Sequence, residues 1–162
     1  MGTMKRFDAG FMRYKTRGVV FPPSIDYPDL STLHADATGI TADCSIGTIP
    51  LRAQDQPVPL EHKARFVYVT GWAIDQVAHR PAGGIHVVID DTFIPVFIGA
   101  RRDDIARAFS NPDYCHCGFV VAVPVTLIGP GSHHISVLFL NARRTAYSAF
   151  PFSAVVQIPG AR

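Results

Sequence analysis

The stretch GIHVVIDDTFIPVFIG (84–99) decides the fold class. Two short runs rich in Val, Ile and Phe meet at Asp90 and Asp91, a residue type that tolerates tight turns and bonds its own backbone. The pattern therefore predicts a β-hairpin. Pro95 cannot donate a hydrogen bond to a neighbouring strand, so we expect its strand to lie at a sheet edge or to carry a bulge. The same reasoning applies to Pro124.

Similar apolar runs, separated by Gly, Pro, Asn and Asp, follow one another from about Ile40 onward. Short Val-, Ile- and Phe-rich runs with this punctuation are typical of strands. The predicted strands are 64–74, 84–90, 92–99, 118–125, 133–141 and 152–158. Turns are expected at 129–131 and near 141–144.

One segment has helical character, RRDDIARAF (101–109). Asp103 or Asp104 can cap its first turn, and Asn-Pro at 111–112 ends it. Its apolar side chains fall on one side: Ile105, Ala108 and Phe109. A single short crossover helix in a succession of strands favours an all-β fold, an immunoglobulin-like β-sandwich.

The composition fits one folded domain preceded by an arm. The chain has 162 residues, 48% of them hydrophobic and 17% charged, which is enough apolar surface for one core. Residues 1–35 differ, because they carry five Lys or Arg and three prolines in FPPSIDYPDL (21–30). We expect an extended N-terminal arm or linker over 1–35 and the sandwich over 36–162. Such an arm is ordered only where it packs on the domain or on a neighbour, which makes a homo-oligomer one alternative.

Charge and hydropathy argue against several classes of protein. The net charge of +2 comes from scattered residues without a basic face, so nucleic acid is not an expected partner. No apolar run reaches the roughly 18 residues of a spanning helix, and the N-terminus lacks the apolar stretch of a signal peptide. Three cysteines argue against a disulfide framework. Because no apolar run is long enough to span a membrane, membrane insertion by this chain is not expected.

Several short motifs in the strand-rich part carry a resemblance. They are GWAID (71–75), Gly99 with RRDDIA (101–106), GF (118–119) and a Gly131-Ser132-His133 turn. This order resembles a recurrent bacterial module, the β-sandwich domain that follows or flanks membrane-embedded sugar-transfer proteins and other envelope proteins. CSIGTIP (44–50) resembles the strand that opens it, and the resemblance covers about 40–158. The resemblance implies a non-catalytic, extracytoplasmic (periplasmic) accessory domain of the cell envelope that contacts a glycan or an envelope protein.

Four residues are candidates for binding: Trp72, Asp75, Arg102 and Asp104. Trp72 is the only tryptophan and could stack on a sugar ring, but a lone Trp among alternating apolar residues more often fills a sandwich core. We expect the core position. Asp75 ends its strand and should bond turn amides. Arg102 and Asp104, at i and i+2, should not face each other on a helix, and we interpret them as a structural clamp at its first turn.

A metal site is the alternative for the cysteines and histidines. Cys115 and Cys117, with His133 and His134, offer ligands that zinc accepts, and His116 and His86 lie within the same set. In an extended strand, however, alternate residues of Cys-His-Cys point to opposite faces, and zinc sites prefer C-x₂₋₄-C spacing. We therefore predict no metal and no cofactor, with both cysteines packing as small apolar groups.

Catalytic motifs are missing from the sequence. There is no G-x-S-x-G elbow, no phosphate-binding Gly loop and no H-E-x-x-H. The main hypothesis is a non-catalytic accessory or binding domain. Two alternatives stay open, a small metal-dependent enzyme built on the Cys and His residues, and a self-assembling structural protein built on the arm.

Overall fold

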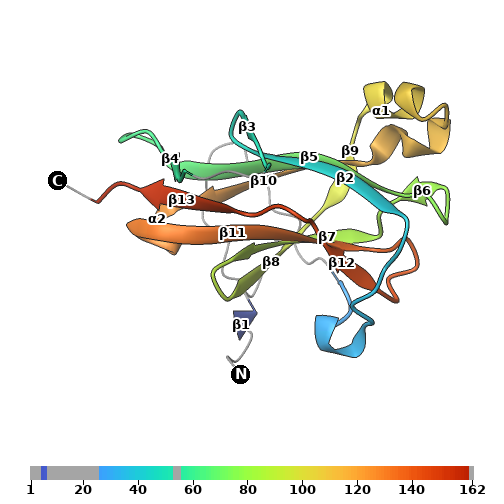
Figure 1. Ribbon diagram of the computed structural model, residues 1–162, viewed down its shortest axis with the longest axis horizontal. Helices are drawn as coiled ribbons and strands as arrows, with labels where there is room; N and C mark the ends of the chain where they lie inside the picture. Colours follow the sequence, from blue (N-terminus) through green and yellow to red (C-terminus); the bar gives the residue numbers. More distant parts are fainter. Residues whose placement is uncertain (1–4, 7–25, 53–55, 161–162) are drawn as a thin grey trace.

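The computed structural model describes residues 5–6, 26–52 and 56–160. Two β-sheets pack face to face, as the two layers of Figure 1 show. The predicted all-β sandwich is therefore confirmed, whereas its immunoglobulin-like character stays a prediction. No helix in the described ranges is long and apolar enough to cross a membrane.

The first sheet, named here the β7 sheet, contains the predicted hairpin. Its strand order is β1-β8-β7-β11-β13-β4, with β12 beside β11. The strands are β1 (Lys5–Arg6), β4 (Val58–Pro59), β7 (Gly84–Ile89), β8 (Thr92–Val96), β11 (Gly131–Leu140), β12 (Tyr147–Ala149) and β13 (Ala154–Ile158). Asp90 makes the hairpin turn at φ 52°, as expected of Asp. Among the described residues, Pro95 has β7 beside it on one side alone, because β1 pairs with Thr92 and Phe93 and does not reach Pro95.

The second sheet, the β5 sheet, has the order β3-β2-β5-β10-β9, with β6 beside β5. Its strands are β2 (Ile40–Ile46), β3 (Ile49–Pro50), β5 (Phe66–Asp75), β6 (Arg80–Pro81), β9 (Ile98–Ala100) and β10 (Gly118–Pro124). β5 is central and antiparallel to both β2 and β10. The pair GF of the sequence motif thus lies directly beside GW, with Phe119 opposite Gly71.

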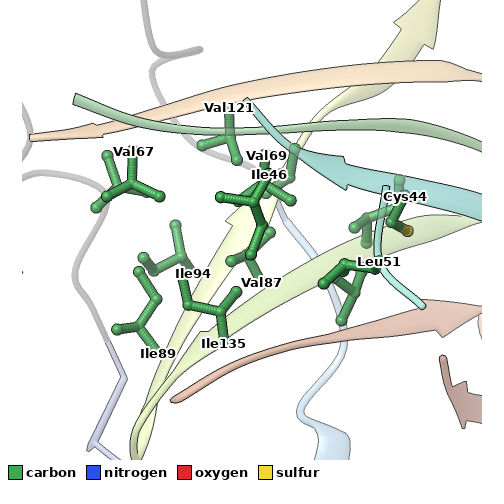
Figure 2. Close-up of a cluster of buried hydrophobic side chains, with 14 of the residues drawn as sticks. Cys44, Ile46, Leu51, Val67, Val69, Val87, Ile89, Ile94, Val121 and Ile135 are labelled. Atoms are coloured by element: carbon green, nitrogen blue, oxygen red, sulfur yellow. The ribbon is translucent and has the colours of Figure 1, made fainter. Parts of the chain in front are cut away.

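The core lies between the two sheets and is almost entirely aliphatic. Alternate residues of each strand point inward, for example Val67 and Val69 from β5 and Val87 and Ile89 from β7. Figure 2 shows these side chains interleaving from both layers. All four are at most 5% exposed, so the alternation read from the sequence has the predicted consequence.

Residues 26–35 of the predicted arm pack on the outer face of the β7 sheet. Tyr27 and Leu30 are buried there, and a 3₁₀ turn, η2 (Leu30–Thr32), follows Asp29, whose carboxylate accepts from the Ser31 amide. Figure 1 shows this segment below the lower layer. Residues 26–35 therefore pack against the sandwich of the same chain. Residues 1–4 and 7–25 of the predicted arm lie outside the described residues.

Three expectations about the helical segments are wrong. Helix α1 (Asp103–Ala108) begins after Arg102, and neither Asp103 nor Asp104 caps it. It is also no crossover, because it connects β9 and β10, which are neighbours in one sheet. The chain crosses between the sheets at several points, among them Phe97 between β8 and β9. Another is a second short helix, α2 (Val125–Ile128), between β10 and β11, which the sequence analysis did not predict.

The Cys-His-Cys segment is not the extended strand that was expected. Residues Pro112–His116 form a 3₁₀ helix, η3, capped by Asn111, whose side-chain oxygen accepts from the Asp113 amide at 3.0 Å. Pro112 at its first position favours such a turn, since its φ is already helical. The local Asn-Pro-Asp chemistry thus outweighs the strand tendency of the residues that follow.

Candidate ligand groove on the β5 sheet

Trp72 does not fill the inter-sheet core, which corrects the sequence interpretation. It points to the outer face of the β5 sheet and is only half-buried. The inward position beside it is Gly71, where a Cβ would lie 2.9 Å from the ring of Phe119, so Phe119 takes the core space. Because side chains alternate along a strand, the residue after Gly71 must point outward.

A small second cluster holds the indole on the outer face. Trp72 packs against the buried residues Ile74, Ile105, Tyr114 and Cys117. Its ring meets Phe109 edge to face at a centroid distance of 5.8 Å. Helix α1 and η3 supply most of this cluster and form one wall above the sheet, visible at the upper right of Figure 1.

An open hollow of about 340 Å³ lies beside this wall. Its floor is a register row across the sheet, in which Asp43 of β2, Trp72 of β5 and Gly118 of β10 lie side by side, followed by a second row of Ser45, Thr70 and Val120. The complete lining is Asp43, Ser45, Thr70, Gly71, Trp72, Ala100, Arg101, Arg102, Gly118, Phe119 and Val120. We call this hollow the groove.

Arg102 and Asp104 face each other across a two-residue separation, contrary to expectation. Nε and Nη2 of Arg102 donate to the two carboxylate oxygens of Asp104 at 2.8 and 2.7 Å. The pairing is possible because Arg102 precedes the helix, with φ −139° and ψ 71°. The Arg102 partner holds the pKa of Asp104 at about 2. The stem of Arg102 lies over Gly118, where a Cβ would be 2.9 Å from its Cγ.

The sequence analysis missed Asp43, which lines the groove, and Arg52, which pairs with it. Nη1 of Arg52 donates to Asp43 at 2.7 Å and Nη2 to its other oxygen at 3.2 Å. The hydrogen bond from Arg52 lowers the pKa of Asp43, and the charge of Arg102 lowers it further. The alternation of Cys44 and Ile46 inward with Asp43 outward was the signal that could have placed this carboxylate.

Asp75 is a structural residue, as predicted. It is 4% exposed, and its Oδ1 accepts from the amides of Val77 and Ala78 at 3.0 and 2.9 Å. Its Oδ2 accepts from the amide of Ala142 at 2.8 Å. Asp75 therefore joins the end of β5 to the turn that follows β11 in the other sheet, and it does not line the groove.

The residues proposed for a metal are not brought together. Cys115 and Cys117 lie at η3 beside the β5 sheet, whereas His133 and His134 lie on β11 of the β7 sheet. Nδ1 of His133 donates to the carboxylate of Asp90 at 2.8 Å, and Nε2 of His134 is hydrogen-bonded to the hydroxyl of Ser153 at 2.9 Å. Across residues 5–6, 26–52 and 56–160, no three His, Cys, Asp or Glu side chains are grouped to hold a metal ion.

The buried cysteines are poor nucleophiles. Burial raises the pKa of Cys117 to about 11, and burial also raises the pKa of Cys44. A thiol reacts as its thiolate, so these two groups are unreactive at neutral pH. Both pack as small apolar side chains, Cys44 in the main core and Cys117 beneath Trp72.

No protein-family model matches the chain, and no curated protein matches it significantly. The motif residues that carry the resemblance nevertheless meet in space. Trp72, Arg102 and Gly118 come from three separate motifs and all line the groove.

Proposed function

We propose that this chain is a non-catalytic carbohydrate-binding module and that the groove of the β5 sheet is its binding site. The observation that carries the proposal is the position of Trp72. The indole is half-buried, is fixed by Phe109, and lines an open polar groove instead of the core. Aromatic rings of this kind present an apolar surface to the apolar face of a sugar ring.

The polar residues around the indole suit a polyhydroxylated ligand. Asp43 and Arg102 flank Trp72 with a carboxylate and a guanidinium, and Ser45 and Thr70 add hydroxyls along the floor. Adjacent sugar hydroxyls can donate to the carboxylate and accept from the guanidinium. A mostly apolar contact with a few convergent polar groups is the usual composition of a small-molecule site.

The protonation states of the groove support binding without catalysis. Glycoside hydrolysis requires one protonated carboxylic acid beside a second carboxylate. Asp43 and Asp104 both have a lowered pKa because an arginine donates to each of them. Neither is a proton donor at neutral pH, and Asp75 is engaged by three backbone amides outside the groove. The lowered pKa values of Asp43 and Asp104 thus favour saccharide binding over hydrolysis in this groove.

The test is a glycan array probed with the full chain, with Trp72→Ala and with Tyr147→Ala. Tyr147 is the matched control, since it is also a partly buried aromatic residue but lies in the β7 sheet. We expect retention of saccharides by the wild type, at least roughly tenfold weaker binding by Trp72→Ala and unchanged binding by Tyr147→Ala. Saccharide binding that survives Trp72→Ala contradicts the proposal. An array that retains no saccharide also contradicts the proposal. Capture of an envelope protein in a parallel pull-down would then favour a protein partner instead.

A further inference from the structure

We infer that the groove holds a neutral saccharide chain that extends along β5 from Trp72 to Tyr68, and not a single sugar or an acidic glycan. This inference rests on the proposed function and specifies its ligand. It draws on two observations independent of the position of Trp72, which are a second exposed aromatic ring on the same strand face and the charge balance of the groove.

The second ring is Tyr68, which is 44% exposed. Side chains at i and i+4 of a strand share one face, so Tyr68 and Trp72 both point outward from β5, about 13 Å apart at a rise of about 3.3 Å per residue. Tyr68 is held by Phe66, with ring centroids 5.9 Å apart. Two anchored aromatic rings at this separation provide two stacking positions. The distance between them is too long for one sugar ring to bridge.

The surface between the two rings carries small, uncharged side chains. Thr70 lies between them on β5, with Ser45 of β2 on one side and Val120 of β10 on the other. Val120 is 61% exposed, so no described residue covers this part of the sheet. Small hydroxyl and apolar side chains here leave room for a chain lying flat, with hydroxyls available to bond it.

The charges around the groove cancel. Three arginines, Arg52, Arg101 and Arg102, are each paired with one aspartate. These aspartates are Asp43, Asp103 and Asp104, so the net charge of the six side chains is zero. An acidic sugar therefore gains no net Coulombic attraction from these six side chains, whereas a neutral hydroxyl needs only one remaining N–H from which to accept. Arg102 keeps Nη1 for this purpose, because only its Nε and Nη2 bond Asp104 within the described residues.

The ion pairs contribute little to folding but orient the groove. Their side chains are between 31% and 74% exposed, and solvent screening leaves exposed pairs of this kind with little effect on stability. Arg52 and Arg102 nonetheless donate through two nitrogens each to one carboxylate, which fixes their guanidinium planes, whereas Arg101 donates through Nε alone. A polar rim that is ordered before binding reduces the entropy lost when a ligand is captured.

The experiment measures Kd by calorimetry for linear β-1,4-linked glucose and N-acetylglucosamine oligomers, from the monosaccharide to the hexasaccharide. Oligogalacturonates of the same lengths are the acidic probes. The proteins are the full chain, Trp72→Ala, Tyr68→Ala, Tyr68→Phe and the Tyr147→Ala control. We expect affinity for a neutral series to rise roughly tenfold or more from disaccharide to hexasaccharide. Tyr68→Ala should remove this gain without weakening the disaccharide, and Tyr68→Phe should keep it, because the ring and not the hydroxyl makes the contact.

The salt dependence tests the charge argument. We expect Kd for the neutral series to change less than about threefold between about 50 mM and about 500 mM salt, since no net charge is neutralised. Trp72-dependent binding without a length dependence, or without an effect of Tyr68→Ala, overturns the extended chain but leaves the proposed function standing. Tighter, salt-sensitive binding of oligogalacturonate overturns the neutral ligand. Failure of all three series to bind counts against both proposals.

Discussion

On the outer face of each sheet a glycine makes room for a large side chain, but one face is closed and the other is open. On the β7 sheet, Gly84 makes room for the ring of Tyr27, whose Cζ would be 2.6 Å from a Cβ there. On the β5 sheet, Gly118 makes room for the stem of Arg102. Tyr27 is buried and its hydroxyl donates to the carbonyl of Val96 at 2.7 Å, which closes the first face. The second face keeps its aromatic residue beside an open groove.

This difference separates structural coverage from binding surface. Tyr27 is contacted by His86 and by the guanidinium of Arg144, 5.2 Å from its ring centre, so several neighbours fix the covering segment. The wall on the β5 sheet covers only the end of β5 near Ile74, and Tyr68 and Val120 stay exposed. Loss of Tyr27 from the face of the β7 sheet should therefore lower the free energy of unfolding. Changes on the open face of the β5 sheet should mainly affect binding.

The largest effect is expected where the two sheets are joined. Asp75→Ala leaves three amide donors without their carboxylate, and we expect the free energy of unfolding to fall by about 3 kcal/mol or more. Asp75→Asn keeps one acceptor oxygen and should lose less. Urea unfolding followed by circular dichroism measures both. A loss below about 1 kcal/mol for Asp75→Ala would mean that water replaces the carboxylate.

The next effect concerns the closed face. Tyr27→Ala removes a buried ring and a hydrogen bond, and we expect a loss of about 3 kcal/mol, whereas Tyr27→Phe should lose about 1 kcal/mol. Saccharide binding by the folded fraction should be unchanged in both. Chemical unfolding together with calorimetry at low temperature measures the two properties separately. Equal losses of stability and affinity would show that the faces are coupled.

A smaller effect is expected from pH. The hydrogen bond with Asp90 raises the pKa of His133 in the folded state. The stabilisation is therefore complete below the unfolded pKa of about 6.5 and is lost as pH rises through the raised folded value. We expect unfolding free energy to fall by less than about 1 kcal/mol over this range, since Asp90 is half exposed. His133→Asn should flatten the profile. Saccharide binding should not change over this pH range, because the ion pairs around the groove contain arginine and aspartate but no histidine.

The smallest effect should come from the open surface itself. Val120→Thr adds a hydroxyl at a position that is 61% exposed, and we expect a change within about 0.5 kcal/mol. Val88→Thr is the matched control on the outer face of the β7 sheet, where Val88 is 7% exposed. A buried hydroxyl there should cost about 1 to 3 kcal/mol. Similar values for the two variants in thermal unfolding would contradict the contrast between the faces.

The sequence predicts the strands well because their signals are local. Asp90 marks the hairpin, and Asp75 accepts from turn amides at the end of its strand. Five of the six predicted strands recur with shifted ends, whereas 92–99 divides at Phe97 into β8 and β9, which belong to different sheets. Segments near proline were harder. Asn111 and Pro112 impose a 3₁₀ turn on a run that resembles a strand, and α2 follows Pro124 without the length that gives a helical period.

The site was predicted less well because alternation does not tell which face is the core. Trp72 was expected inside, and only the ring of Phe119 over Gly71 decides that it points outward. The pairing of Arg102 with Asp104 depends on where α1 begins, since two residues at i and i+2 of a helix point about 200° apart around its axis and Arg102 lies just before the helix. Asp43 and Arg52 meet through the turn between β2 and β3; strand alternation indicates that Asp43 points outward, but their spacing does not predict that they pair.

The wall that carries Arg102 and Phe109 is a connection between two neighbouring strands, β9 and β10. A segment of this kind can be lengthened, shortened or exchanged without altering strand register or the aliphatic layer beneath it, because its ends stay fixed. The scaffold is thus a starting point for grafting: new recognition properties can be built by replacing residues 101–117 with a segment that still covers Ile74, with the strands of both sheets retained.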